Sequence, residues 1–507
     1  MSDSAFNDEL LERELFGGDS DELDGAGIGA GGMMDMDDDD GDMAGLDGAD
    51  SGTTPASAAA SAAPPAGPAA VAAAAADPDA KPAGARAPAL DIELDDPPGE
   101  TTVLGHPPRA PPTVPSAAAT CQTYSILPTM ALINQYQIHA VAAVADMRWV
   151  FTGGEDGYIK RWDFYATASG RQLLTQGQRH PYVDSVTKAG VMASYWDHSD
   201  TSETGIDVLS PVYSLAVHSQ AEWLVSGMKS GRIGLWTVRH DEGRRITLLA
   251  KHRGPVSVLR ISPDEFGLVS GSWDRAVLYW DLNTGKLARM FAGHTSQISS
   301  IAFRPTWGGE QYEEYRQQAA DAGGDDGGDG ASFGSRQPSP VIMTTSIDGQ
   351  CLLWDVRAPR ALPHSFAMPA KTPPWAAAAC WSCDGRRVYV GRRNNTVDEY
   401  ELGMGPQPVR TLRLPTNSGP VTALAAMSNG RSLICASTDN VRMWDLDQSA
   451  DRRSPVPFQI IPGHHGGTVS SVLVSNSSRY MLTTSGNRGW DGTSNNVFLG
   501  YEIKPVA

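Results

Sequence analysis

The stretch SGSWDRAVLYWDLNTGK, residues 270–286, decides the fold of this chain. It places Ser270, Asp274 and the pair Trp280-Asp281 at intervals of four and six residues. Two short runs of alternating apolar and polar residues flank turn-forming residues, which is the pattern of an antiparallel hairpin. Serine and aspartate are also reagents in hydrolases, so the same stretch raises the question of catalysis. Whether these residues have a structural or a catalytic role depends on how often the set recurs along the chain.

The same strand ending, an aromatic residue usually followed by an acid, occurs seven times. The seven aromatic residues are Trp162, Trp236, Trp280, Trp354, Tyr400, Trp444 and Tyr501. Successive endings are 74, 44, 74, 46, 44 and 57 residues apart, a period of about 44 with insertions near 164–211, 306–340 and 485–496. A period of 40 to 45 residues with a Trp-Asp ending is typical of four-stranded propeller blades. The sequence predicts an all-β, seven-bladed WD-repeat β-propeller over residues 123–507.

The ends of the repeat region indicate how the ring closes. The chain stops six residues after Tyr501, so the seventh blade lacks an outer strand of its own. The stretch YSILPTMALINQYQ, residues 124–137, precedes the first full unit without a partner. Because an open ring would leave exposed sheet edges, we expect this N-terminal strand to complete the last blade.

The N-terminal region differs sharply in composition from the repeats. From Met1 to Thr123 there are 24 acidic and 4 basic residues, a net charge of −20, whereas the remainder has 35 and 36, a net charge of +1. The segment DELDGAGIGAGGMMDMDDDDGD is followed by Ala/Pro-rich sequence that has few apolar side chains to bury. We therefore expect residues 1–122 to form a disordered acidic tail.

Several classes of protein are excluded by composition. The acidic N-terminus and the absence of a long apolar run argue against a secretion signal or a membrane helix, and predict a soluble intracellular protein. The five cysteines have no framework spacing, and Cys380 and Cys383 of the CWSC stretch are expected to be core or turn residues. We expect no metal site and no cofactor.

The repeat resembles the WD-repeat propeller family, in which a His, a Ser or Thr, an Asp and the terminal Trp form one hydrogen-bonded chain. Two units match that set in full: His252, Ser270, Asp274 and Trp280, and His294, Thr344, Asp348 and Trp354. The first unit has Thr152, Asp156 and Trp162 at the same spacing, with His139 closer to the Thr than the pattern requires. An indole N–H can be accepted by a hydroxyl, which donates to an imidazole, which donates to a carboxylate.

Recurrence favours a structural role for these residues over catalysis. A nucleophile is normally unique and lies in a cleft, whereas this set recurs blade after blade and ends on a Trp. The protein is therefore expected not to be an enzyme. Three blades depart from the pattern: Ser230 and Asn394 occupy the Asp position in the second and fifth, and TDNVRMWD is shortened in the sixth. We expect those blades to be softer.

The family resemblance also implies a partner-binding face. The residue before each turn Asp points from that face, and these residues are Glu155, Lys229, Trp273, Ile347, Arg393 and Thr438. Trp273 and Ile347 lie in neighbouring blades, where an exposed aromatic beside an aliphatic would form an interface anchor. Alternatively, each side chain packs against an adjacent loop.

A narrower resemblance is carried by SVTKAGVMASYW (185–196), LSPVYSLAVHSQAEWLVSGMKSGRIGLWTVRHDEGRRI (209–246), VSGSWDRAVLYWDLNTGK (269–286) and SGNRGWDGTSNN (485–496). Together they resemble the WD-repeat subunits of the Spt group in the fungal SAGA transcription coactivator, whose members also begin with a long acidic region. The resemblance implies a non-enzymatic nuclear subunit of a SAGA-like histone acetyltransferase complex. It further implies binding of TATA-binding protein, regulation of its delivery to RNA polymerase II promoters, and no sequence-specific nucleic-acid or membrane binding.

The acidic tail is compatible with that role, because a chain of net charge −20 attracts basic surfaces in a salt-dependent manner. A tail that only solubilises the protein is the simpler alternative. Its first part, FNDELLERELFGGDSDELD, could also fold on a partner as an amphipathic turn. Two other functions stay open. The WDVR stretch at Trp354 to Arg357 resembles the box of cullin-type ubiquitin ligase receptors, and a histone-tail reader would need an acidic or aromatic pocket near Glu155 and Trp273.

Overall fold

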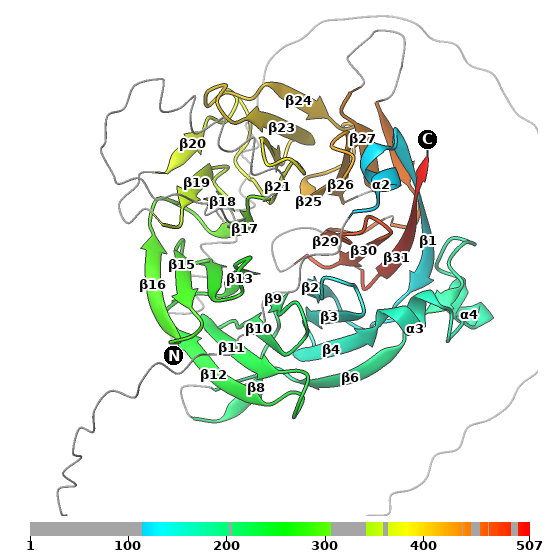
Figure 1. The fold of residues 1–507 in the computed structure, drawn as a ribbon, viewed down its shortest axis with the longest axis vertical. Coiled ribbons are helices and arrows are strands. Elements are labelled where there is room, and N and C mark those ends of the chain that lie inside the picture. Colours follow the sequence, from blue (N-terminus) through cyan, green and yellow to red (C-terminus); the bar gives the residue numbers. More distant parts are fainter. Residues whose placement is uncertain are drawn as a thin grey trace, which may run out of the picture. The chain divides into compact units, whose positions relative to one another are not determined.

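The computed structural model describes residues 114–201, 205–305, 341–357, 363–438, 440–447, 457–464, 466–487 and 495–506. Seven antiparallel sheets stand around a common axis like the blades of a propeller (Figure 1). The predicted all-β, seven-bladed propeller is therefore confirmed. Residues 1–113, for which the sequence predicts an acidic disordered tail, lie outside the described residues, as do most of the insertions at 306–340 and 485–496.

Each of the first six blades is a four-stranded sheet, and its strands follow one another along the chain. In blade 1 the short β5 (Lys188–Ala189) comes between the third and fourth strands. Blades 1 to 3 are built from β2 (Ile138–Ala143), β3 (Trp149–Gly154), β4 (Tyr158–Asp163) and β6 (Met192–Asp197); β9 (Ser214–Val217), β10 (Trp223–Gly227), β11 (Arg232–Thr237) and β12 (Arg245–Ala250); and β13 (Val256–Ile261), β14 (Gly267–Ser272), β15 (Val277–Asp281) and β16 (Lys286–Phe291). Blades 4 to 6 are built from β17 (Ile298–Phe303), β18 (Val341–Ser346), β19 (Cys351–Asp355) and β20 (His364–Phe366); β21 (Ala378–Trp381), β22 (Arg387–Gly391), β23 (Thr396–Glu401) and β24 (Arg410–Arg413); and β25 (Val421–Ala426), β26 (Ser432–Ser437), β27 (Val441–Asp445) and β28 (Phe458–Ile461).

The seventh blade joins the two ends of the repeat region. Its strands are β29 (Val469–Val474), β30 (Tyr480–Ser485), β31 (Phe498–Val506) and, in the outer position, β1 (Thr123–Ala131). β1 pairs antiparallel with β31, from Thr123 opposite Val506 to Ala131 opposite Leu499. The short β5 (Lys188–Ala189) adds a fifth, parallel strand outside β1. The first strand of the described chain thus closes the ring by pairing with the last described strand.

Two expectations about segment boundaries need correction. Residues 164–211 are not wholly an insertion, because the outer strand β6 of blade 1 lies within them. The remainder forms α3 (Phe164–Ala168), α4 (Gln176–Arg179), β5 and the hairpin of β7 (Ser199–Thr201) with β8 (Asp207–Leu209). The tail also ends earlier than expected, since α2 (Ser116–Thr120) buries Ala118 against the last two blades and Tyr124 donates a hydrogen bond to the Ala118 carbonyl.

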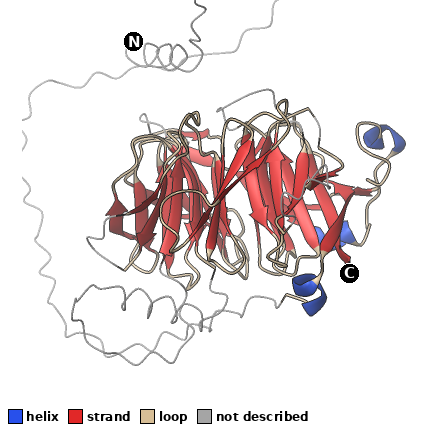
Figure 2. Ribbon diagram, turned by 90° about the horizontal axis from the view of Figure 1, so that it is seen from above, coloured by secondary structure: helices blue, strands red, loops and turns tan. Residues whose placement is uncertain are grey.

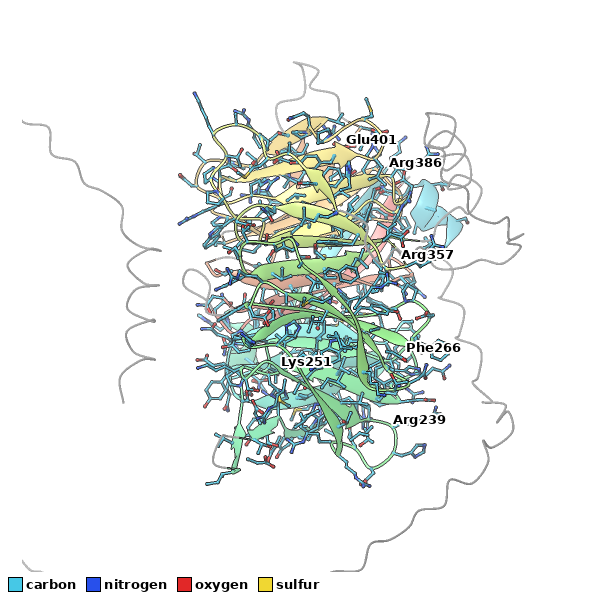
Figure 3. The ribbon with its side chains drawn as sticks, turned by 90° about the vertical axis from the view of Figure 1, so that its left-hand side faces the viewer. Arg239, Lys251, Phe266, Arg357, Arg386 and Glu401 are labelled. Carbon is cyan, nitrogen blue, oxygen red and sulfur yellow. The ribbon has the colours of Figure 1, made fainter. Side chains whose placement is uncertain are left out.

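The loops form two faces, which the side view separates (Figure 2). We call upper the face formed by the turns between the second and third strands of each blade and by the connections between blades. The lower face carries the turns between the first and second strands and between the third and fourth. Arg239, Phe266, Arg357, Arg386 and Glu401 lie along the lower face, and Lys251 lies toward the other side (Figure 3).

The apolar core is divided among the seams between blades. Each of the seven clusters of buried apolar side chains combines residues of two adjacent blades. Leu259 and Trp280 of blade 3 pack with Val225 and Ile233 of blade 2, for example. Because a single twisted sheet cannot bury both of its faces alone, each blade depends on its two neighbours.

Hydroxyl groups near the axis add a polar connection across four of these seams. Each lies at the upper end of an inner strand and donates to a backbone carbonyl of the next blade. The bonds run from Ser214 to Val256 (2.7 Å), Ser257 to Ile298 (2.6 Å), Ser299 to Ala376 (2.5 Å) and Ser470 to Ile138 (2.7 Å). Three of the donors, Ser257, Ser299 and Ser470, sit at a one-residue register shift that turns the side chain toward the neighbour.

Closure by β1 predicts a measurable asymmetry along that strand. Met130 is fully buried between blades 7 and 1, whereas Leu127 is 47% exposed. We expect Met130→Ala to lower the free energy of unfolding by about 2–4 kcal/mol, because it leaves a cavity at the closing seam. Leu127→Ala is the matched control and should change it by less than about 0.5 kcal/mol in urea titrations. Equal effects of the two changes would contradict a closing role for β1.

Candidate partner-binding site

Blade 3 contains the complete side-chain network expected from the sequence. Trp280 Nε1 donates to Ser270 Oγ at 2.8 Å, and Ser270 Oγ lies 2.8 Å from His252 Nε2. His252 Nδ1 lies 3.0 Å from Asp274 Oδ2, and the Arg253 N–H donates to the same oxygen at 2.8 Å. Since the hydroxyl accepts from the indole, it donates to Nε2, and Nδ1–H donates to the carboxylate. The network fixes the upper turn of the blade to the segment that enters it.

Blade 4 brings its four residues together by a longer route. Trp354 Nε1 donates to Thr344 Oγ1 at 2.8 Å, and Thr344 lies 2.7 Å from His294 Nε2. The other ring nitrogen of His294 lies 2.8 Å from Ser346 Oγ, which in turn donates to Asp348. Sequence spacing did not reveal Ser346, because it lies between the two recognised positions on the same turn.

Blade 1 keeps only part of the network. Trp162 Nε1 donates to Thr152 Oγ1 at 2.9 Å, but Asp156 forms its ion pair with Lys160 at 2.6 Å. His139 is buried, with its ring stacked on Tyr213 of blade 2 at a centroid distance of 5.7 Å. A lysine has therefore taken the place of the imidazole as the partner of this carboxylate.

Blade 2 contains two residues that the sequence analysis missed. Trp236 Nε1 donates to Ser226 Oγ at 2.7 Å, so Ser226 acts as the hydroxyl acceptor. His198 is fully buried 5.8 Å from the Trp236 ring, and its Nδ1 lies 2.7 Å from the Ser210 carbonyl oxygen. Ser226 stands ten residues before the Trp, as in blades 1, 3 and 4, which is the signal that could have found it.

Blade 5 replaces the network by a buried ion pair. Arg392 Nε donates to Asp398 at 2.8 Å, and both side chains are almost entirely buried. Arg392 also donates to the Tyr400 hydroxyl at 2.8 Å and to the Gly349 carbonyl of blade 4 at 2.6 Å. The expected softness of this blade stays a prediction, but the blade is not without polar connections.

Hydrogen bonding and burial set the charge of the acid of blade 3 and of two buried histidines. Hydrogen bonds from His252 and the backbone outweigh desolvation and lower the pKa of Asp274 to about 2. Burial lowers the pKa of His294 to about 4, and burial likewise lowers that of His198 to about 4. The imidazoles of His198 and His294 are therefore neutral at physiological pH, and the Ser270 and Thr344 hydroxyls are each bonded to a Trp and a His.

The six residues expected on the partner-binding face lie on the upper turns, but not all are free. Trp273 is half-buried with its ring packed edge-on against Tyr213 at 5.5 Å, and Ile347 is also half-buried. Thr438 donates to the Ser418 carbonyl at 3.1 Å, whereas Glu155, Lys229 and Arg393 are exposed. Trp273 thus packs on a neighbouring loop while still reaching the surface. Its role as an anchor, together with Ile347, stays a prediction.

Few other features of the described chain offer a site. A concave region of about 550 Å³ between blades 1 and 2 is lined by Trp196, Asp207, Arg245 and their neighbours. Within the described ranges no group of three acidic, His or Cys side chains could hold a metal ion, and no helix is long and apolar enough to span a membrane. In the WDVR stretch, Trp354 is buried and Arg357 projects from the lower face.

Comparison with known proteins matches the whole described propeller. The family model of the SPT8 beta propeller matches residues 124–337 and 331–504. The chain belongs to the SPT8 β-propeller family. SAGA complex subunit Spt8 of Schizosaccharomyces pombe is 40% identical to it over 76% of this chain and 80% of the relative. SAGA complex subunit SPT8 of Saccharomyces cerevisiae is 34% identical, over 76% of this chain and 74% of the relative.

Other relatives are less similar in sequence to this SPT8-family chain. The periodic tryptophan protein 2 homolog of Dictyostelium discoideum is 28% identical over 34% of the chain. The two SAGA subunits are thus more similar to this chain in sequence, at 40% and 34% identity.

The blade 3 network can be tested by removing its central hydroxyl. Ser270→Ala would leave the buried Trp280 N–H and His252 Nε2 without their partner. We expect this change to lower the free energy of unfolding by about 2–4 kcal/mol, measured with denaturant. Thr247→Ala, at an exposed position of the neighbouring blade, should have little effect. A loss below about 0.5 kcal/mol for Ser270→Ala would show that the network contributes little.

The buried imidazoles predict a loss of stability on mild acidification. In the unfolded chain His198 and His294 bind a proton near pH 6.5, but in the folded chain only near pH 4. The stability that this provides is complete above pH 6.5 and is lost as the pH falls toward 4, by about 2 kcal/mol per histidine at pH 5.

The variant His198→Asn keeps a donor for the Ser210 carbonyl and should reduce the loss between pH 7 and pH 5 by about 2 kcal/mol. His240→Asn, at an exposed site, serves as the control and should leave the pH dependence unchanged. Urea titrations at pH 7 and pH 5 give the change in the free energy of unfolding for each protein. If that change were the same in His198→Asn as in the wild type, the His198 imidazole would titrate normally.

Proposed function

We propose that this protein is a non-enzymatic subunit of a SAGA-type transcription coactivator complex in the nucleus. One observation carries the proposal: relatives described as SAGA complex subunits from two yeasts align with 74% and 80% of their own lengths. The family model matches residues 124–337 and 331–504, which together span the propeller. A function inferred from a match over the whole propeller is better supported than one inferred from a match to a few repeats.

The non-enzymatic role is supported by the environment of the Ser, His and Asp of blade 3, a set that resembles a hydrolase triad. Ser270 is fully buried, accepts a hydrogen bond from Trp280 and lies against His252. A nucleophile must be accessible to substrate and must stand beside an oxyanion hole. The Ser, His and Asp of this set hold a turn in place instead.

We further propose that TATA-binding protein is a partner and that the acidic N-terminal segment provides the electrostatic attraction. TATA-binding protein grips DNA through a basic surface, so a polypeptide of net charge −20 can compete for that surface. The upper face of the propeller would serve other subunits of the complex, with Trp273 and Ile347 as apolar anchors.

The first experiment is purification of the full chain from nuclear extract by an affinity tag, followed by identification of the proteins that accompany it. We expect subunits of an acetyltransferase complex. The double variant Trp273→Asp with Ile347→Asp should recover fewer of them than the wild type. Met290→Asp with Ile460→Asp, at exposed apolar positions elsewhere on the ring, should recover as many. A cullin adaptor in place of these subunits would contradict the proposal and favour a ubiquitin ligase receptor.

The tail contribution is measured separately, with purified TATA-binding protein. Deleting residues 1–113 should weaken binding about tenfold at low salt and flatten its salt dependence, because long-range attraction is screened as ionic strength rises. The deletion stops before α2, so that Ala118 stays in the folded part. An unchanged salt dependence would show that the ring, and not the tail, supplies the contact.

A further inference from the structure

Two exposed basic side chains lie beside apolar ones on the upper face of blades 4 and 5, which are neighbours in the ring (Figure 1). Lys371 belongs to the segment that connects β20 to β21, and Arg393 to the turn between β22 and β23. The connecting segment also carries Met368, which is 39% exposed, and the half-buried Trp375. Ile347, also half-buried, lies on the turn between β18 and β19. We call these five residues the blade 4–5 surface.

Close contacts join the three segments that carry these residues. The guanidinium carbon of Arg393 lies 4.6 Å from the centroid of the Trp375 ring, so the β22–β23 turn meets the connecting segment. A Cβ atom on Gly349, in the β18–β19 turn, would lie 2.8 Å from the Met368 sulfur. Arg392, next to Arg393 in the chain, donates to the Gly349 carbonyl at 2.6 Å and ties the two turns together. The five side chains are therefore presented from one continuous surface.

The polypeptide beside the two cations is poor in acidic residues. The connecting segment AMPAKTPPWAA (367–377), the turn RRNN (392–395) and the segment LPTNSGP (414–420), which leads into blade 6, contain none. The exposed Glu155 belongs to blade 1, three blades away round the ring. Asp439, between β26 and β27 of blade 6, lies outside the described residues.

The one acid of the β18–β19 turn, Asp348, is occupied by donors of its own surroundings. It accepts from the Thr295 and Ser346 hydroxyls and, at 3.2 Å, from the backbone N–H of Gln350. Lys371 and Arg393 form no ion pair within the part of the chain that the structure describes. With two cations against one carboxylate, the surface keeps a net positive charge.

We propose that the blade 4–5 surface docks an acidic peptide segment of another protein, one that carries an aliphatic or aromatic side chain among its carboxylates. The carboxylates pair with Lys371 and Arg393, and the apolar side chain packs on Met368 and Ile347. Because Arg393 is held against the Trp375 ring, its guanidinium loses little freedom when it binds a carboxylate. The arrangement thus favours a ligand with both kinds of group.

A nucleic acid fits this surface less well than an acidic peptide does. Proteins that bind nucleic acids use a row of cations along the phosphates, and those that bind single strands also stack bases on open aromatic faces. Here two cations are available, and Arg393 covers one face of the Trp375 ring. The exposed Met368 gains nothing from a phosphate but matches an apolar side chain of a peptide.

The inference rests on the proposed use of the upper face by partners, and it adds the chemistry of one such partner. The two can fail separately. Binding of a purified peptide does not require a SAGA-type complex, and capture of complex subunits from an extract does not require an acidic ligand on blades 4 and 5.

Fluorescence anisotropy of a labelled synthetic peptide mixed with the full-length protein tests the proposal. The probe is mostly Asp and Glu, with a few Leu and Phe between them. At low salt we expect a dissociation constant on the order of 10 μM, because each exposed ion pair contributes little. Binding should weaken several-fold as the salt concentration rises to about 200 mM. A second peptide of the same charge, with Ala in place of Leu and Phe, should bind at least about fivefold more weakly.

A matched pair of variants separates the blade 4–5 surface from the general charge of the protein. Lys371→Glu with Arg393→Glu should weaken binding of the probe at least about tenfold, because the contacting cations become anions. Lys251→Glu with Arg253→Glu makes the same change of charge at exposed positions between blades 2 and 3, on the same face. It should alter the affinity by no more than about twofold, since only long-range repulsion is added. Thermal unfolding checks that both variants are folded.

Three results would overturn the proposal. Equal weakening in the two double variants would mean that the peptide responds only to net charge. Equal affinity for the two peptides would mean that no apolar contact is made. If the acidic probe did not bind, while a short duplex DNA bound and lost its affinity only in Lys371→Glu with Arg393→Glu, the surface would be one for nucleic acid.

Discussion

The pairing of β1 with β31 is the constraint on which the rest of the structure depends. Every apolar cluster of the propeller lies between two blades, so a blade with one neighbour missing exposes half of its buried surface. A linear row of blades would leave two such faces. The ring removes both, and it does so with hydrogen bonds along a whole strand and with the buried residues Met130, Leu132 and Phe498 at the final seam.

Polar side chains add hydrogen bonds to the apolar packing between the blades. The Trp, hydroxyl, imidazole and carboxylate of blade 3 hold the upper turn against the incoming chain, and the blade 4 network does the same with one additional serine. These networks also determine which charges reach the surface. Asp274 is held inside the structure, whereas Arg253 and Arg275 beside it face solvent. The architecture of the repeat thereby shapes the electrostatic character of the face that meets partners.

The sequence predicted the blade count, the closing strand and most of the blade 3 and blade 4 networks, because these features depend on spacing within one repeat. It did not predict Lys160 in place of a histidine, Ser346 as a relay or the Arg392–Asp398 pair. Those depend on which side chains meet in three dimensions across a turn or a seam. Trp273 illustrates the same limit: its position was read correctly from the repeat, but its contact with Tyr213 comes from another blade.

The position of β1 also has a consequence for biosynthesis. Its partner β31 is separated from it by more than 360 residues and is the last strand of the propeller to leave the ribosome. Six blades can form during translation, but the edge of β1 and the seam faces beside it stay open until β31 emerges. Such long-range pairing is slow and leaves a strand edge vulnerable to aggregation. A nascent chain of this topology is therefore a natural client for chaperones that shield edges until synthesis is complete.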